Sequence, residues 1–85
     1  MYIGVKKVEP LDDFKLLLTF VNDEEKIFDM SSYLSHGLFA ELKNESMFRS
    51  VHVCFDSIEW ANGVDICPEV LYEESVPVTA SSNTL

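Results

Sequence analysis

The sequence has few of the residues from which catalytic and metal-binding sites are usually built. It contains two cysteines, two histidines and three glycines among 85 residues. The glycines stand far apart, which excludes a glycine-rich phosphate-binding loop. The two cysteines, Cys54 and Cys67, have no companion pair and do not form a zinc-binding pattern. We therefore expect a protein that is not an enzyme, with no catalytic residues, no metal site and no cofactor.

Long apolar runs are also absent. No run approaches the roughly twenty residues that are needed to cross a bilayer. The opening residues Met1 to Gly4 read as a strand and not as a secretory leader. We expect a cytoplasmic protein that does not bind membranes, with Cys54 and Cys67 reduced and packed as small core residues.

Basic residues are scarce, because six Lys and Arg stand against fifteen Asp and Glu and give a formal charge of −9. Proteins that bind nucleic acid gain most of their affinity from Lys and Arg on phosphates. The charge therefore argues against direct nucleic-acid binding and favours a basic protein partner. The alternative is that the acidity only keeps a small protein in solution.

Hydrophobic residues are plentiful, at 47% of the chain, and 12% of the residues are aromatic. This is generous for the small core of one short domain, so some apolar surface is available for a partner or a second copy. We predict a single domain over residues 1–75. Residues 76–85 have no periodicity and predict a flexible C-terminal tail.

The hydrophobic pattern predicts an α+β fold with a small, mainly antiparallel sheet and two or three short helices, in the order β-β-β-α-β-β-β-α. Residues 14–21 are the clearest strand: Phe14, Leu16, Leu18 and Phe20 share the core face. The other face carries Leu17 and is only partly covered. The remaining predicted strands span 2–9, 26–30, 51–55, 58–60 and 64–67, and the helical segments span 31–34, 38–43 and 68–74, with 44–46 as a break.

Residues 51–55 form a predicted strand with Val51, Val53 and Phe55 facing inward. His52 and Cys54 share the opposite side of this strand. Side chains two apart on a strand diverge, and no third residue is placed to orient them, so they do not predict a nucleophilic pair.

Asn62-Gly63 predicts a two-residue type I′ hairpin turn, which would pair Trp60 with Asp65 across the loop. Either these two side chains form an exposed recognition patch, or Trp60 anchors the core and Asp65 accepts a hydrogen bond from a nearby N–H. Pro68 suits the first turn of the helix that follows. The complete set of candidate interaction residues is Trp60, Asn62, Gly63, Asp65, Tyr72 and Leu17.

Spaced pieces of the sequence occur in an order that is typical of one bacterial family. They are Val8-Glu9-Pro10-Leu11-Asp12-Asp13-Phe14-Lys15-Leu16, Phe20-Val21-Asn22-Asp23-Glu24 with Phe28-Asp29, Gly37-Leu38-Phe39-Ala40-Glu41-Leu42, Phe48-Arg49-Ser50-Val51, Ile58-Glu59-Trp60-Ala61-Asn62-Gly63-Val64-Asp65-Ile66, and Pro68-Glu69 with Leu71-Tyr72. Together they resemble the "domain of unknown function 2442" family over nearly all of residues 1–75. Asp23 and Ala61 depart from it, since the family typically has Gly and often has Pro at these turns.

The resemblance implies an α+β fold of a small antiparallel sheet with short helices, and no established activity. It also implies a gene setting like that of antitoxins in two-gene bacterial modules, often beside a small basic "domain of unknown function 4160" protein. Some members of the family are fused to a helix-turn-helix domain, which this chain does not carry.

Two functions follow as expectations. The first is an acidic protein-interaction domain, an antitoxin-like partner of a small basic protein encoded nearby. The second is a structural or regulatory homo-oligomer, such as a homodimer, with a small-ligand or transcription-regulatory role. The partly apolar face that carries Leu17 and Val21 motivates the second.

Overall fold

Two antiparallel sheets form the framework of a computed structural model that describes residues 3–78. The first sheet has the strand order β1-β2-β3-β7 and the second has the order β4-β5-β6. The strands are β1 (Val5–Leu11), β2 (Lys15–Phe20), β3 (Glu25–Asp29), β4 (His52–Cys54), β5 (Ser57–Glu59), β6 (Asp65–Ile66) and β7 (Val76–Pro77). The α-helices are α1 (Glu45–Phe48) and α2 (Pro68–Glu74), and 3₁₀ turns span Asp12–Phe14, Ser31–Tyr33 and Gly37–Lys43.

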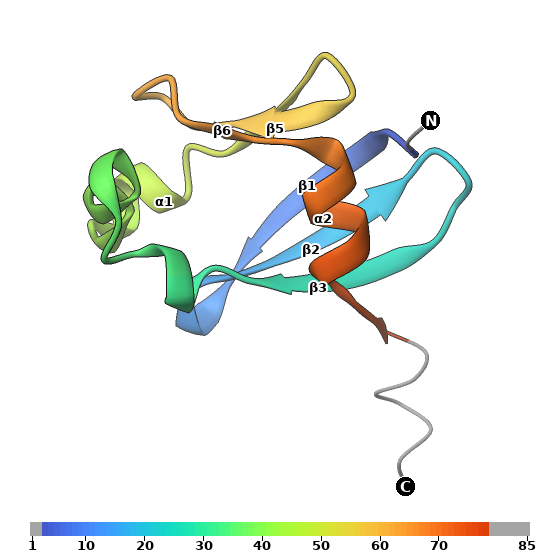
Figure 1. The fold of residues 1–85 in the computed structure, drawn as a ribbon, viewed down its shortest axis with the longest axis horizontal. Coiled ribbons are helices and arrows are strands. Elements are labelled where there is room, and N and C mark those ends of the chain that lie inside the picture. The colour runs from blue at the N-terminus through green and yellow to red at the C-terminus, as the bar shows by residue number, and fades with distance from the viewer. Residues whose placement is uncertain (1–2, 79–85) are drawn as a thin grey trace, which may run out of the picture.

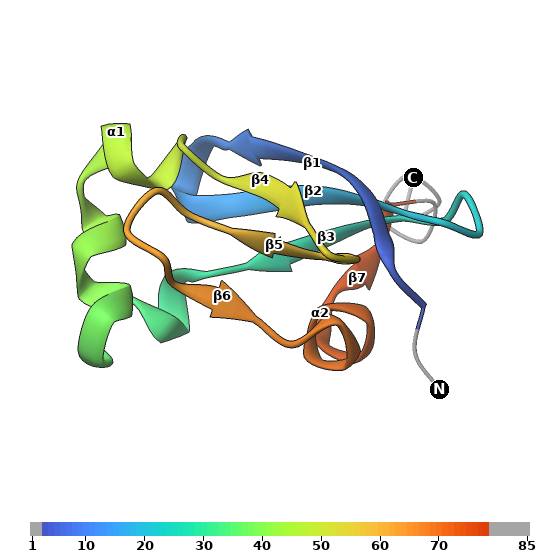
Figure 2. The same ribbon diagram turned by 90° about the horizontal axis from the view of Figure 1, so that it is seen from above.

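The second sheet and the helices lie on one side of the first sheet (Figure 1). Viewed from above, β4 and β5 lie over the first sheet and β6 is offset beyond β3, with α1 at one end and α2 on the same side as β6 (Figure 2). The core fills the space between these layers. Its buried residues are Val5, Leu16, Leu18, Phe20, Phe28, Met30, Leu34, Leu42, Phe48, Ile58, Trp60, Val64, Ile66 and Leu71. Among residues 3–78, no element covers the opposite face of the first sheet.

The alternating pattern of β2 correctly predicts its two faces. Leu16, Leu18 and Phe20 are fully buried, whereas the side chains between them are half-buried. Phe14 also packs against the core as predicted, but it was wrongly assigned to the strand, since it lies in the 3₁₀ turn before β2 with a φ of 58°. Its ring packs edge-on against Phe48, with the centroids 5.3 Å apart.

The α+β class and the antiparallel pairing predicted from the sequence are confirmed, with two sheets in place of one. The predicted break at 44–46 is confirmed at Asn44, where the 3₁₀ segment ends, but was wrong for Glu45 and Ser46, because Asn44 caps α1 and its side-chain oxygen accepts a hydrogen bond from the backbone N–H of Met47 at 3.1 Å. Asn is a favoured residue both in loops and at helix N-caps, so composition alone does not separate the two.

The chain continues as a strand beyond the expected end of the domain. Val76 and Pro77 form β7, which pairs with Ile27 and Lys26 of β3, whereas the sequence assigned these residues to a tail. A two-residue strand containing proline carries no alternating pattern, so sequence periodicity does not detect it. The rest of the expected tail, residues 79–85, lies outside the described residues, as does Tyr2 of the first predicted strand.

Candidate protein-binding site

The β4–β5 hairpin ends in an exposed aromatic side chain. Cys54 pairs with Ser57, so Phe55 and Asp56 form a two-residue turn, with φ values of 48° and 67°. The Phe55 side chain is 94% exposed. A bulky L residue is rarely found at positive φ, and here its ring contacts no core residue that would offset the strain.

The prediction that Val53 and Phe55 face inward was therefore wrong, since Val53 is also 38% exposed. The reason is that β4 ends at Cys54 and the chain turns at Phe55, so alternation stops one residue before the ring. No glycine or asparagine marks this turn in the sequence, and the usual signal for a type I′ hairpin is missing.

The outer face of the second sheet is acidic. Ile58 pairs with Ile66 and both point into the core, so their neighbours Glu59 and Asp65, which pair with each other, point outward. His52 extends this row on β4, and its Nε2 lies 3.3 Å from Oε1 of Glu59. Within the described part of the chain, no Lys or Arg forms an ion pair on this face.

A hollow of about 520 Å³ lies on this face between the tip of the hairpin and the start of α2. We call it the acidic hollow, and its lining includes Phe55, Glu59, Asp65, Cys67 and Glu69. It combines one exposed aromatic ring with three carboxylates. Such a surface can accept a Lys or Arg side chain, because the ring face attracts cations and the carboxylates pair with them.

The two cysteines lie at the acidic hollow and are not in the core, contrary to the prediction. Cys54 is half-buried, Cys67 is exposed and both are free thiols. The pKa of Cys54 is raised above its ordinary value, first by desolvation and then by the negative charges of Glu59 and Asp65. This thiol is therefore held in its neutral, weakly nucleophilic form at neutral pH.

The charges around the acidic hollow have no basic counterparts in the same part of the chain. All six Lys and Arg precede residue 50, so the segment 50–85 contains six carboxylates and no Lys or Arg. Lys6 and Arg49 form ion pairs with Asp23, Asp12 and Glu45, which also precede residue 50. Among Lys and Arg, Lys26 of β3 reaches α2, where its Nζ donates a hydrogen bond to the carbonyl of Tyr72.

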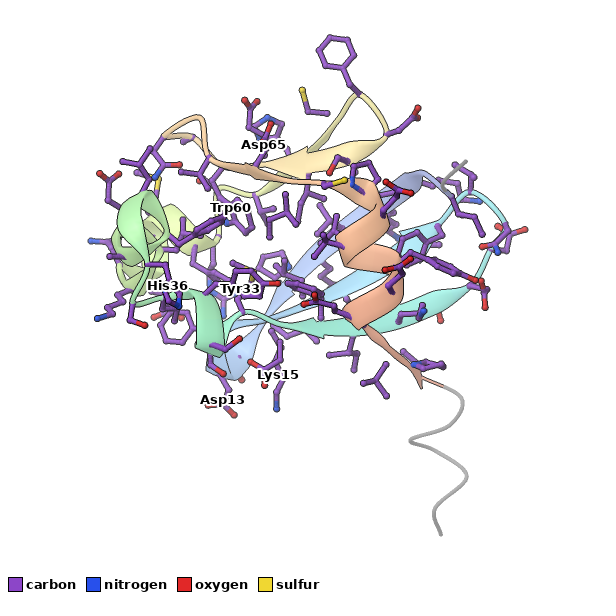
Figure 3. The ribbon with its side chains drawn as sticks, in the orientation of Figure 1. Asp13, Lys15, Tyr33, His36, Trp60 and Asp65 are labelled. Carbon is purple, nitrogen blue, oxygen red and sulfur yellow. The ribbon has the colours of Figure 1, made fainter. Side chains whose placement is uncertain are left out.

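Trp60 anchors the core, as the second of the two sequence alternatives proposed. It is fully buried, and its Nε1 donates a hydrogen bond to the carbonyl of Phe48 at 2.9 Å. The predicted pairing of Trp60 with Asp65 was wrong: the N–H of Trp60 donates to the carbonyl of Val64, and Asp65 pairs with Glu59. Trp60 points between the sheets while Asp65 points away from them (Figure 3).

The loop at Asn62-Gly63 has three residues and not two, which explains this shift. Gly63 has a φ of 88° and Asn62 does not have a positive φ, so the turn is closed by a left-handed glycine. Asn62 is held by its own contacts, since its Nδ2 donates to Oε1 of Glu41 at 2.9 Å and its Oδ1 accepts from the N–H of Val64.

Tyr72 and Leu17 lie away from the acidic hollow. Tyr72 packs edge-on against Phe20, with the centroids 5.0 Å apart, and its hydroxyl donates a hydrogen bond to Glu24. The Nζ of Lys26 sits 3.9 Å from the centre of the same ring. Leu17 is on the open face of the first sheet. Of the six predicted residues, the structure places only Asp65 in the acidic hollow.

The described part of the chain offers neither a metal cluster nor a membrane-spanning helix. Residues 3–78 contain no group of three or more His, Cys, Asp or Glu side chains arranged to hold a metal ion. None of the helices in these residues has the length and apolar character that spanning a membrane requires.

Comparison with known proteins gives one match. A family model described as "Protein of unknown function (DUF2442)" matches residues 5–77, in agreement with the sequence resemblance. This range begins with β1 and ends with β7, so it contains every strand and both α-helices. No curated protein and no solved structure matches the chain.

Proposed function

This chain belongs to the DUF2442 family, and we propose that it is an acidic interaction domain that binds a small basic protein at the acidic hollow. The single observation that carries the proposal is Phe55, a 94% exposed phenylalanine at the tip of a hairpin. Large aromatic side chains that a partner can bury are the residues that most often dominate binding energy.

The chemistry around Phe55 favours a basic partner. Glu59, Asp65 and Glu69 line the same hollow, and residues 50–85 supply no Lys or Arg to neutralise them. A partner that inserts a Lys or Arg would gain ion pairs and a cation–π contact with the ring, while an adjacent apolar residue covers Phe55. The negative field would also speed its association at low ionic strength.

The biological form that we propose is an antitoxin-like partner of a small basic protein encoded nearby. The family resemblance supplies this setting, and the position of the acidic hollow supplies the surface.

The test is to co-express the chain with the basic protein encoded by the adjacent gene and to measure their affinity by titration calorimetry. Phe55→Ala should weaken binding at least about tenfold, and Asp65→Asn should weaken it less and flatten its dependence on salt. Glu45→Gln removes the same charge from α1 and serves as the control, with affinity close to wild type. Equal affinity for Phe55→Ala and the control would refute the site.

A further inference from the structure

The open face of the four-stranded sheet carries an apolar row that the strand register defines. Leu17 of β2 pairs with Ile27 of β3, and Ile27 pairs with Val76 of β7. Leu17 and Ile27 are half-buried, and Val76 is 55% exposed. These residues share the face opposite the core, where Lys15 also points (Figure 3). No element of residues 3–78 covers this apolar row, and exposed apolar patches of this kind are typical of interaction surfaces.

We propose that this face binds the same face of a second copy of the chain. The argument for a second copy comes from the charged residues that surround the apolar row. Lys7, Lys15, Glu9, Glu25 and Asp29 occupy outward positions on β1, β2 and β3, so this face is close to neutral in a protein with a net charge of −9. Two copies therefore repel each other least when these faces meet.

The register also gives this face one pair of matched charges, at the level of Thr19. Thr19 pairs with Lys7 on one side and with Glu25 on the other, so opposite charges flank β2 at the same level. A two-fold axis lying along β2 exchanges the two flanks and places each Lys7 opposite Glu25 of the second copy. The same axis stacks Leu17 on Leu17 and Lys15 on Lys15, and it sets Ile27 opposite Glu9, so the attraction between charges comes from the two Lys7–Glu25 contacts. Neither Lys7 nor Glu25 has an ion pair within residues 3–78, so both are free for this contact.

The size of the face predicts how strong the dimer is. The six residues of β2 span about 20 Å at about 3.3 Å per residue, and the neighbouring strands add about 5 Å each. Such a footprint is smaller than the roughly 800 Å² per partner of a standard stable interface. We expect a dimer that forms and dissociates with protein concentration.

Charge reversal tests this geometry. Sedimentation equilibrium on the full chain should show dimers for wild type within a range up to about 1 mM. Lys7→Glu and Glu25→Lys should each raise the dissociation constant about tenfold. The double variant should bring it back to near the wild-type value, because the swapped charges meet again. Lys43→Glu, on the exposed side of the 3₁₀ segment Gly37–Lys43, makes the same charge change away from this face and is the control.

Two outcomes would overturn the proposal: a wild-type chain that stays monomeric throughout, or a double variant that dimerises no better than the single ones. Far-ultraviolet circular dichroism of each variant shows whether it remains folded. Ile27→Ser tests the apolar row independently and should also weaken the dimer. Phe55→Ala should leave the dimer unchanged, so the outcome does not depend on the partner-binding site.

Discussion

Replacing Phe55 by asparagine should stabilise the protein while it weakens partner binding. Phe55 has a φ of 48° in a two-residue turn. A residue with a β-carbon costs about 1–2 kcal/mol in the left-handed region, and asparagine is among the few that adopt it readily. Because the ring is 94% exposed, its removal forfeits almost no buried surface. Relief of the local backbone strain therefore decides the sign of the change in stability.

We expect Phe55→Asn to raise the free energy of unfolding by about 1 kcal/mol, which corresponds to about 4–8 °C in Tm for a domain of this size. Urea unfolding followed by tryptophan fluorescence gives the value, since Trp60 is buried in the folded state. The same variant should bind the basic partner at least about tenfold more weakly. These two results together would mean that the natural sequence keeps Phe55, at a cost in stability, because its ring binds the partner.

Phe14→Asn is the matched control, because Phe14 also has a positive φ, of 58°, but its ring packs against Phe48. There the lost packing outweighs the relief of strain, and the free energy of unfolding should fall. If Phe55→Asn lowers stability as Phe14→Asn does, the ring of Phe55 is held by contacts within the chain and the reasoning fails.

Three other substitutions test how the core and α2 are held, each by urea unfolding followed by far-ultraviolet circular dichroism, because Trp60→Phe removes the one tryptophan of the chain. Trp60→Phe should lower stability by about 2–3 kcal/mol, because the carbonyl of Phe48 loses its donor and a cavity forms; a loss below about 1 kcal/mol would contradict this. Gly4→Ala would place a Cβ 2.9 Å from the Cβ of Asp56 and should destabilise the protein, whereas adding Asp56→Gly should restore it; failure of this rescue would exclude the clash as the cause. Tyr72→Phe removes the hydrogen bond that lowers the pKa of Glu24 from its ordinary value of 4.5. Since the folded pKa lies below the unfolded one, this stabilisation is present above the unfolded pKa and is lost as pH falls through the folded pKa. The difference between wild type and Tyr72→Phe should therefore shrink on acidification, and a pH-independent difference would argue against the Glu24 contact.

Regular elements were predictable where the sequence repeats a pattern. The alternation in residues 15–20 correctly indicates the buried face, and Pro68 correctly marks the start of α2. Turns were harder, because several loop lengths fit the same residues. Asn62-Gly63 is compatible with both two- and three-residue loops, and the shift moves Asp65 from opposite Trp60 to opposite Glu59.

The acidic hollow was missed for a related reason. Its key residue, Phe55, follows an alternating run and so reads as a core residue until the turn is known. Contacts between distant residues, such as those of Tyr72 with Glu24 and of Ile27 with Val76, depend on the assembled fold. Periodicity reports only local geometry, so neither contact has a signal in a single sequence.

The two proposed surfaces lie on opposite sides of the molecule, so partner and second copy do not touch each other. We predict that partner binding and dimerisation nevertheless affect each other, through the net charge of the protein. The acidic hollow is lined by residues of β4–β6 and the start of α2, and the proposed dimer face is formed by outward residues of β1–β3. The two sheets lie one above the other (Figure 1). A basic partner at each hollow reduces the net charge of −9 and hence the repulsion between copies. We expect saturating partner to lower the dimer dissociation constant and, by thermodynamic linkage, dimerisation to raise partner affinity by the same factor. Sedimentation with and without partner measures this, and the effect should vanish as rising salt screens the charges. A partner that leaves the dimer constant unchanged at low salt would show that the copies do not repel each other across this face.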